Sequence, residues 1–378
     1  MATRKSVFLY SSEFEKLSYP ASCPFNVSRV PRLKKILKSM ELLSGNDISE
    51  IAPKPAERMA LKKFHTARYL HTLKTASKGK FETDALNMGI GTSDCPIFSD
   101  MYKYSALACG ATLLGAELIL SGKADAVFNP SGGLHHAGPE RASGFCYMND
   151  VALGCMKLAE AGRKVLYLDV DVHHGDGVAN AFYDRDDVMT ISFHESGKML
   201  FPGTGFEDEI GSGRGAGYCV NVPLPPGTFD QEYMRAFNVI AVPLIKAFGP
   251  DVIVFELGAD GLAGDPLAHL SLTNNTYAEI ISILLSFDKA ILMVGGGGYN
   301  IANTVRAWAL GWAVLCGEVD EHSMNLGAGG VMLGNTEWQG GLKDGELVVS
   351  SKQRETVKTQ IDAIIKVLKA KVFSFHNV

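Results

Sequence analysis

The chain has 378 residues, of which 46% are hydrophobic, so it is long and apolar enough to bury a substantial core. It carries 36 lysines and arginines against 41 aspartates and glutamates, which gives a formal net charge of −5. This balance excludes nucleic-acid binding driven by a basic surface. The seven cysteines are irregularly spaced and form no Cys-x-x-Cys pair, which is typical of a reducing compartment and not of a disulfide framework.

The N-terminal segment has only a short apolar run, Val7 to Tyr10, which is too short for the core of a signal peptide. No apolar segment approaches the roughly 20 residues of a membrane span without an interrupting glycine or charge. We therefore expect a cytoplasmic protein with no membrane partner and no direct nucleic-acid partner.

Short apolar runs predict strands, and Ala/Leu-rich stretches between them predict helices. The predicted strands are 6–10, 125–129, 164–168, 188–193, 218–222, 252–257 and 290–294. The predicted helices are about 103–121, 147–161, 231–247, 275–287 and 301–316. This alternation is typical of an α/β fold with a mainly parallel central sheet and helices on both faces.

The C-terminal part lacks this alternation. Segment 324–347 is rich in glycine and without periodicity, so we expect an irregular surface excursion there. Apolar residues then recur at helical spacing and predict an amphipathic helix over about 352–371. Docking on the body of the protein is the favoured interpretation of this helix, and partner binding is the alternative. At about 150 residues per domain the length suggests two domains, but the candidate site residues depend on one another across 131–260, so we expect one domain over 1–378.

Metal-binding side chains follow two of the predicted strands. Asp171 and His173 come after 164–168, and Asp260 comes after 252–257. Ligands bind beyond the carboxyl ends of the strands in an open α/β sheet, so we expect these side chains to meet. Three protein ligands with an open position for water are typical of catalytic zinc. Two carboxylates and one imidazole also suit Fe(II), so both metals stay open.

Two adjacent histidines, His135 and His136, follow the predicted strand 125–129. Two imidazoles near one metal-bound water can divide the proton transfers, one accepting as water attacks and one donating to the leaving amine. Each needs a carboxylate on its other ring nitrogen, and the acids that flank the metal ligands, Asp169 and Asp176, are the candidates.

A run of four glycines, 295–298, follows the last predicted strand and ends at Tyr299. Glycines let a loop pass close to a bound substrate, and a tyrosine at its tip can donate a hydrogen bond to a developing oxyanion. The run alone also fits a nucleotide-binding turn or a hairpin. No GxGxxG follows a first strand and no GxxxxGK[ST] is present, so a phosphate role is not expected. There is no GxSxG nucleophile elbow either.

Six stretches of the sequence carry a resemblance to a known family. They are SGGLHHA, ASGFCYMND, YLDVDVHHGDGV, FPGTG, ELGADGLAGDPL and GGGGYNIANTVRAW. Together they resemble the zinc-dependent histone deacetylase family, with its bacterial deacetylase-like and acetoin-utilisation members, over about 6–317. The resemblance implies a single-domain arginase/deacetylase-like fold. It also implies a metal-dependent amidohydrolase that removes acetyl or other acyl groups from lysine side chains of proteins or peptides.

The resemblance also assigns roles to individual residues. The implied metal ligands, for Zn²⁺ or Fe²⁺, are Asp171, His173 and Asp260. The implied catalytic residues are His135, His136, Tyr299, Asp169 and Asp176, with Tyr299 polarising the acyl carbonyl. The implied substrate-binding residues are Gly144, Phe145 and Phe201, which line a tube for the acyl-lysine stem, with the rim residue Asp94 and Leu267. The residue implied to line an internal cavity below the metal is Arg29.

Members of this family also bind monovalent cations, so the resemblance implies K⁺. The inner potassium site would use Asp169, Ser192 and backbone oxygens of Asp171, His173 and Phe193. The outer site would use Phe182, Val188 and Tyr218, although Arg185 stands where a threonine is common.

Two departures from the family pattern bear on partners and substrates. Pro266 and Ala302 occupy positions where corepressor-bound class I enzymes carry arginines that contact an inositol phosphate, so no such contact is expected. Gly138-Pro139 replaces charged residues that are common in eukaryotic relatives, which affects the pocket mouth.

Three other functions are weighed against the sequence. An acetylpolyamine deacetylase would use the same chemistry on a smaller cation, typically with an insertion that narrows access, and none is obvious. A catalytically silent acyl-lysine-binding module would lack a metal ligand or Tyr299. An arginase-type binuclear manganese hydrolase would need more Asp and His ligands.

Overall fold

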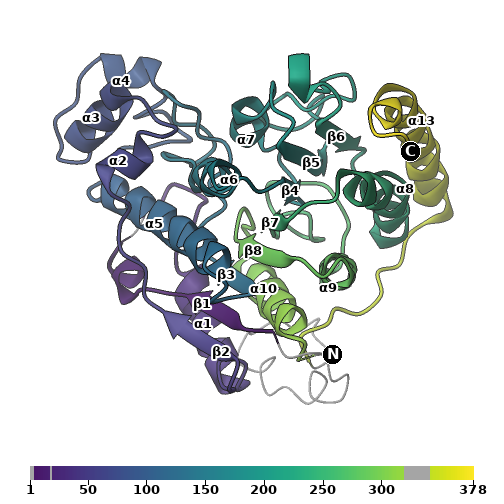
Figure 1. Cartoon of the computed structure of the whole chain (residues 1–378), viewed down its shortest axis with the longest axis horizontal. Helices are drawn as coiled ribbons and strands as arrows, with labels where there is room; N and C mark the ends of the chain where they lie inside the picture. Colours follow the sequence, from purple (N-terminus) through teal and green to yellow (C-terminus); the bar gives the residue numbers. More distant parts are fainter. Residues whose placement is uncertain (1–3, 18, 319–340) are drawn as a thin grey trace.

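The computed structural model describes residues 4–17, 19–318 and 341–378. Eight strands form one sheet in the order β2-β1-β3-β8-β7-β4-β5-β6 (Figure 1). Every neighbouring pair in this sheet is parallel. The strands are β1 (Ser6–Leu9), β2 (Ile48–Ile51), β3 (Ala126–Asn129), β4 (Val165–Asp169), β5 (Val188–Glu195), β6 (Cys219–Leu224), β7 (Val252–Glu256) and β8 (Ala290–Val294). The predicted parallel α/β architecture is confirmed.

Helices cover both faces of the sheet (Figure 1). Those that pack on one face are α3 (Ala67–Ala76), α5 (Met101–Leu120), α6 (Asp150–Glu160) and α7 (Asp176–Ala181). Those that pack on the other are α1 (Arg29–Ser39), α8 (Asp230–Phe248), α9 (Asn274–Ser286), α10 (Ile301–Cys316) and α13 (Ser351–Lys371). The shorter elements are α2 (Arg58–Leu61), α4 (Asp84–Asn87) and the 3-10 turns η1 (Ser12–Lys16), η2 (Gly213–Gly215) and η3 (Phe373–Phe375).

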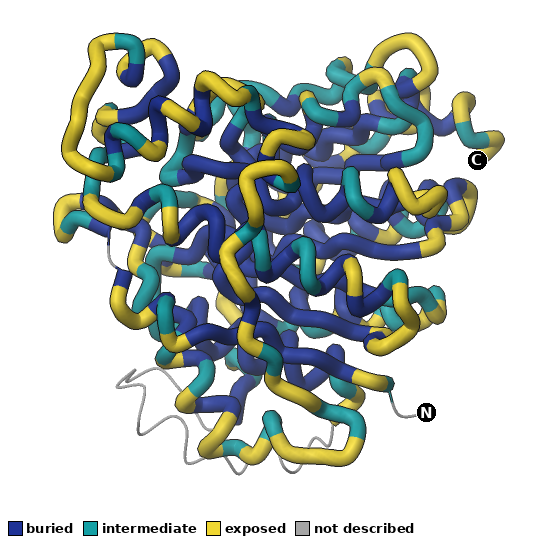
Figure 2. The backbone as a smooth tube through the Cα atoms, turned by 60° about the vertical axis from the view of Figure 1, so that its left-hand side comes forward, coloured by how far each residue is buried: buried dark blue, intermediate teal, exposed yellow. Residues whose placement is uncertain are grey.

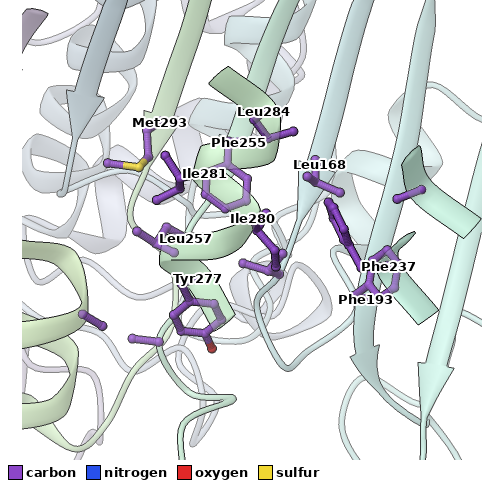
Figure 3. Packing of buried hydrophobic residues seen from close by; sticks show 14 of the residues in the cluster. Leu168, Phe193, Phe237, Phe255, Leu257, Tyr277, Ile280, Ile281, Leu284 and Met293 are labelled. Atoms are coloured by element: carbon purple, nitrogen blue, oxygen red, sulfur yellow. The ribbon is translucent and has the colours of Figure 1, made fainter. Parts of the chain in front are cut away.

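The central strands contribute to two core layers, because successive side chains of a strand point to opposite faces. In β4, Leu166 and Leu168 face the layer under α8 and α9, whereas Tyr167 faces the layer under α5 and α6. Figure 3 shows the first layer, where the ring centroids of Phe193 and Phe237 lie 5.5 Å apart. Burial on both faces explains why these strands read as continuous apolar runs.

The structure adds elements that the sequence patterns did not predict and corrects one helix start. The edge strand β2 pairs with β1, and the helices α1 and α3 lie in the N-terminal third of the chain. Helix α6 begins at Asp150 and not at 147, because the Asn149 side chain accepts a hydrogen bond from the backbone N–H of Ala152 and caps the helix there.

The predicted C-terminal helix is present as α13 and packs along α8 (Figure 1). Its buried residues are Val357, Ile361, Ile364 and Leu368. Of the expected excursion 324–347, residues 341–347 form neither helix nor strand, and 324–340 lie outside the described residues.

Helix α5 is long and apolar enough to cross a membrane by length and composition alone. Within the structure, however, 72% of its apolar window is buried. Figure 2 shows the buried interior that such elements form, with exposed residues concentrated in the loops. Core helices of this kind pass the same compositional test, so we interpret α5 as a core helix.

Candidate active site

Loops that follow four adjacent strands bring the candidate residues together. The strands β3, β8, β7 and β4 are consecutive in the sheet, and all four are parallel (Figure 1). Their carboxyl ends therefore lie along one edge, where the loops that contain the histidine pair, the glycine run, Asp260 and Asp171 must meet. The predicted meeting of these segments is confirmed.

The ligand atoms of Asp171, His173 and Asp260 all lie within 4.8 Å of one another, and all three side chains are buried. The Nδ1 atom of His173 is 3.0 Å from Oδ2 of Asp260 and 3.3 Å from Oδ1 of Asp171. Two carboxylates and one imidazole that converge in this way form a donor set for a divalent transition metal. The residues therefore fit a mononuclear metal centre.

The glycine run holds these carboxylates in place. The N–H of Gly297 donates to Oδ2 of Asp171 at 2.6 Å, and a Cβ atom at Gly297 would lie only 2.0 Å from Oδ2 of Asp260. The other oxygen of Asp260 accepts from the N–H of Val172 at 3.0 Å. A side chain at 297 would therefore displace Asp260, one of the candidate metal ligands, so the close approach of this loop requires glycine.

Each histidine of the pair is bonded to its own carboxylate. The Nδ1 atom of His135 is 2.9 Å from Oδ2 of Asp169, and the Nδ1 atom of His136 is 2.8 Å from Oδ1 of Asp176. The two Nε2 atoms lie 3.0 Å apart, and Nε2 of His135 is 3.9 Å from Oδ1 of Asp171. The carboxylates thus orient both rings so that the two Nε2 atoms face each other, and that of His135 also lies near a candidate metal ligand.

The surroundings shift the pKa values of the two imidazoles in opposite directions. Burial, reinforced by the neighbouring His135, lowers the pKa of His136 to about 4. Burial also acts to lower the pKa of His135, but the negative charges of Glu256, Asp169 and Asp171 outweigh it and raise that pKa well above its usual value. Neighbouring titratable groups with separated pKa values fit the roles of a base and an acid.

Tyr299 lies at the end of the glycine run and faces the same site. Its ring centroid is 6.4 Å from that of His173 and 5.8 Å from that of Phe145. Burial near Asp260 and Asp171 raises the pKa of Tyr299 well above its usual value, so the hydroxyl keeps its hydrogen and can donate. The backbone N–H of Tyr299 donates to Asp265 at 2.7 Å, and this carboxylate also accepts from the N–H of Leu267 at 2.9 Å.

Two of the predicted wall residues, Gly144 and Phe201, lie against His136. Gly144 adopts φ +52°, and a Cβ atom there would lie 2.4 Å from Cδ2 of His136. The Phe201 ring centroid is 5.0 Å from that of His136, and this side chain is 43% exposed. Asp94 accepts a hydrogen bond from the N–H of Gly144 at 3.0 Å, which places it beside the wall segment that also contains Phe145.

Residues 23–315 match the family of the Histone deacetylase domain. The chain belongs to the histone deacetylase family. It is 40% identical over 322 residues to the acetoin utilization protein AcuC of Bacillus subtilis (strain 168), with 83% of each chain covered. It is 38% identical over 325 residues to histone deacetylase 8 of Xenopus tropicalis, which covers 84% of this chain and 86% of that protein.

Solved structures give the same assignment. An HDAC homologue from Aquifex aeolicus superposes with a TM-score of 0.83 at 33% identity, covering 94% of this chain and 99% of that one. An HDAC homologue complexed with SAHA superposes with a TM-score of 0.83 at 31% identity. This match covers 97% of this chain and 100% of that one. The arginase/deacetylase-like fold is thereby confirmed, and the protein is a hydrolase of the deacetylase family.

The residue implied to line the internal cavity lies under the glycine run. Arg29 begins α1 and is buried, and its Nη1 donates to the carbonyl of Gly298 at 3.0 Å. Its guanidinium carbon lies 4.6 Å from the ring centroid of Phe25 and 4.9 Å from that of Trp308. Arg29 therefore supports the loop that ends at Tyr299.

Two residues of the predicted inner potassium site lie opposite each other on neighbouring strands. Asp169 of β4 pairs in register with Ser192 of β5, whose hydroxyl is 2.8 Å from Nδ1 of His194. At the outer site, the Arg185 guanidinium lies 5.3 Å from the ring centroid of Phe182. This guanidinium is paired with Asp187, to which it donates at 2.8 Å and 2.6 Å.

The segment that contains the histidine pair is held by two residues, Asn149 and Asp150, whose supporting role the sequence analysis did not predict. Asp150 accepts hydrogen bonds from the N–H groups of Leu134 at 2.8 Å and Gly133 at 3.3 Å. The side-chain amide of Asn149 donates to the carbonyls of His135 at 3.1 Å and Ala137 at 3.0 Å. Asn149 caps α6 and Asp150 is its first residue, and both lie at the end of the matched stretch ASGFCYMND, which is the sequence signal that could have singled them out.

His65 extends this support and gives a testable pH dependence. It is buried, and its Nε2 accepts from the N–H of Asn149 at 3.0 Å. Burial lowers the pKa of His65 to about 4, below the roughly 6.5 of an unfolded chain. Between these values only the unfolded form gains this proton, so acidification should lower the free energy of unfolding by about 1.4 kcal/mol per pH unit for this group.

The prediction is that His65→Gln flattens the decline in unfolding free energy between pH 6.5 and pH 4, as measured by urea unfolding. The same substitution at His71, which is exposed on α3, is the control and should leave the slope as it is. An equal slope in His65→Gln and the wild type would contradict a neutral His65.

Proposed function

We propose that the protein removes acetyl, or other acyl, groups from lysine side chains of proteins or peptides. The observation that carries this proposal is the histidine pair, with each Nδ1 bonded to its own carboxylate and with Nε2 of His135 only 3.9 Å from a metal-binding oxygen. A structural metal site has no need of two oriented, titratable imidazoles beside it, whereas amide hydrolysis needs a proton acceptor and a proton donor.

The three ligand side chains would hold Zn²⁺, or Fe²⁺, which polarises a carbonyl and lowers the pKa of bound water when it is present. His136, kept neutral by its surroundings, accepts a proton from the attacking water at Nε2. His135, which carries the proton more tightly, donates to the leaving amine. Tyr299 donates its hydroxyl hydrogen to the developing oxyanion. We also propose K⁺ at the inner site around Asp169 and Ser192.

The surroundings of His136 support a long, narrow substrate. The rings of Phe145 and Phe201 and the bare backbone of Gly144 offer apolar surfaces that suit the methylene stem of an acyl-lysine. Asp94 lies beside this segment and would grip the backbone of a peptide substrate. An acetylpolyamine, which carries a similar stem with no backbone amides, is the alternative substrate.

The first test is metal removal. Chelation should abolish release of acetate from acetyl-lysine peptides, because the carbonyl and the water lose their activating ion, and Zn²⁺ or Fe²⁺ should restore it. The related structure complexed with SAHA supports a further expectation, that SAHA inhibits this protein too.

Parallel assays on longer acyl-lysine peptides and acetylated polyamines select among the substrate classes. Full activity in a thoroughly metal-depleted preparation would refute the proposed chemistry. Binding of acetyl-lysine peptides without turnover by the metal-loaded protein would favour the silent binding module.

A further inference from the structure

A second buried carboxyl group lies behind His135. Glu256 ends β7, where it pairs in register with Asp169 of β4, and its side chain is fully buried. Its Oε1 is 3.1 Å from Nδ1 of His135, and its Oε2 is 2.6 Å from the hydroxyl of Tyr167. Glu256 is four residues before Asp260 and is no part of the metal triad.

The hydroxyl of Tyr167 lies between two carboxyl groups. It is 2.7 Å from Oδ2 of Asp169 and 2.6 Å from Oε2 of Glu256. A phenol has a single hydrogen to donate, so it satisfies only one of these two contacts. The other contact is a hydrogen bond only if the carboxyl group itself carries the hydrogen and donates it to the phenol oxygen.

The neighbours show which carboxyl group carries this hydrogen. Asp169 already accepts from the backbone N–H of Asp171 at 2.9 Å and is bonded to Nδ1 of His135 at 2.9 Å, as an ionised carboxylate would be. Nδ1 of His135, which lies 3.1 Å from Oε1 of Glu256, directs its one hydrogen to Asp169, so among the described residues Oε1 is left without a hydrogen-bond partner. A buried and unsatisfied carboxylate is far costlier than a buried carboxylic acid, so the hydrogen belongs on Oε2 of Glu256. In agreement, burial raises the pKa of Glu256 well above its usual value.

We propose that Glu256 is a positioning residue for His135 and acts as a neutral carboxylic acid. It donates to Tyr167, so that Tyr167 donates to Asp169 and Asp169 accepts from Nδ1 of His135. This order of donors fixes the imidazole with Nε2 toward His136 and leaves one negative charge, and not two, behind the pair. This inference depends on the proposed deacetylase function in one respect, because that function is the reason why His135 has a proton to transfer.

The hydrogen on Glu256 can be detected without turnover. The infrared difference spectrum between wild type and Glu256→Gln at neutral pH should contain the C=O band of a protonated carboxylic acid, shifted in D₂O. The matched control is Glu232→Gln, because Glu232 is also buried but accepts from the Arg235 guanidinium at 2.8 Å. That difference spectrum should lack the band. Absence of the band for Glu256 would overturn the proposal.

Measurements of kcat and KM then distinguish a Glu256 that positions His135 from a Glu256 that only fills space in the core. Glu256→Gln keeps a neutral donor toward Tyr167 and should retain kcat close to wild type. Glu256→Leu removes the donor and should lose roughly 10–100-fold in kcat with KM little changed. An equal loss in the Gln variant would mean that the negative charge matters and would overturn the proposal, as would a wild-type kcat in the Leu variant. If Leu prevents folding, the Gln variant and the infrared band still decide. A wild-type protein without hydrolytic activity would count against the proposed function alone.

Discussion

Asp260→Ala is expected to lose the bound metal, whereas His136→Ala should keep the metal and lose turnover. Asp260 is one of three side chains whose ligand atoms converge within 4.8 Å, and two remaining ligands hold a divalent ion far less tightly. His136 is bonded to Asp176 and lies outside that triad, so its removal leaves the ligands intact. Loss of a general acid or base typically costs roughly 10²–10⁴-fold in rate.

Metal analysis of the purified variants, together with kcat on an acetyl-lysine peptide, tests this division of roles. Asp125→Ala is the control, because Asp125 precedes β3 at the opposite ends of the strands and is exposed. It should keep both metal and turnover. Normal metal content in Asp260→Ala would refute the ligand assignment, and a wild-type kcat in His136→Ala would refute its role in proton transfer.

How far the sequence predicts the fold depends on burial. Strands β3 to β8 are buried on both faces, so most of their residues are apolar and a simple pattern detects them. Strand β2 lies at the edge with half-exposed side chains, and its sequence Ile-Ser-Glu-Ile has no such run. Helix α1 carries a stripe of Val30, Leu33, Ile36 and Leu37 at helical spacing, but its many lysines and arginines conceal the stripe.

The candidate site also contains residues that the sequence identifies and residues that only the structure reveals. Groups in the matched motifs at the ends of predicted strands were identified, and the structure brings Asp171, His173 and Asp260 together as expected. Glu256 ends a predicted strand too, yet its contact with His135 depends on the register that sets it opposite Asp169. Register between strands about 90 residues apart is set by tertiary packing and is not written in either strand alone.

Tyr299→Phe is expected to lose roughly 10²–10³-fold in kcat, the usual cost of removing one donor to an oxyanion. The ring packs against Phe145 and His173, and phenylalanine preserves both contacts. Fold, metal content and substrate binding should therefore stay near wild type, because the bond forms only as charge develops on the carbonyl oxygen.

Single-turnover rates and substrate affinity for Tyr299→Phe distinguish an oxyanion donor from a tyrosine that only packs the glycine run. Tyr102→Phe on α5 is the matched control, since that tyrosine is also partly buried and lies outside the candidate site. Tyr102→Phe should leave both the single-turnover rate and the substrate affinity at their wild-type values. Loss of affinity in proportion to rate would mean that the hydroxyl binds the ground state of the substrate. A change of less than about tenfold in kcat would contradict the assignment, because a transition-state donor in a site closed to water contributes far more than that.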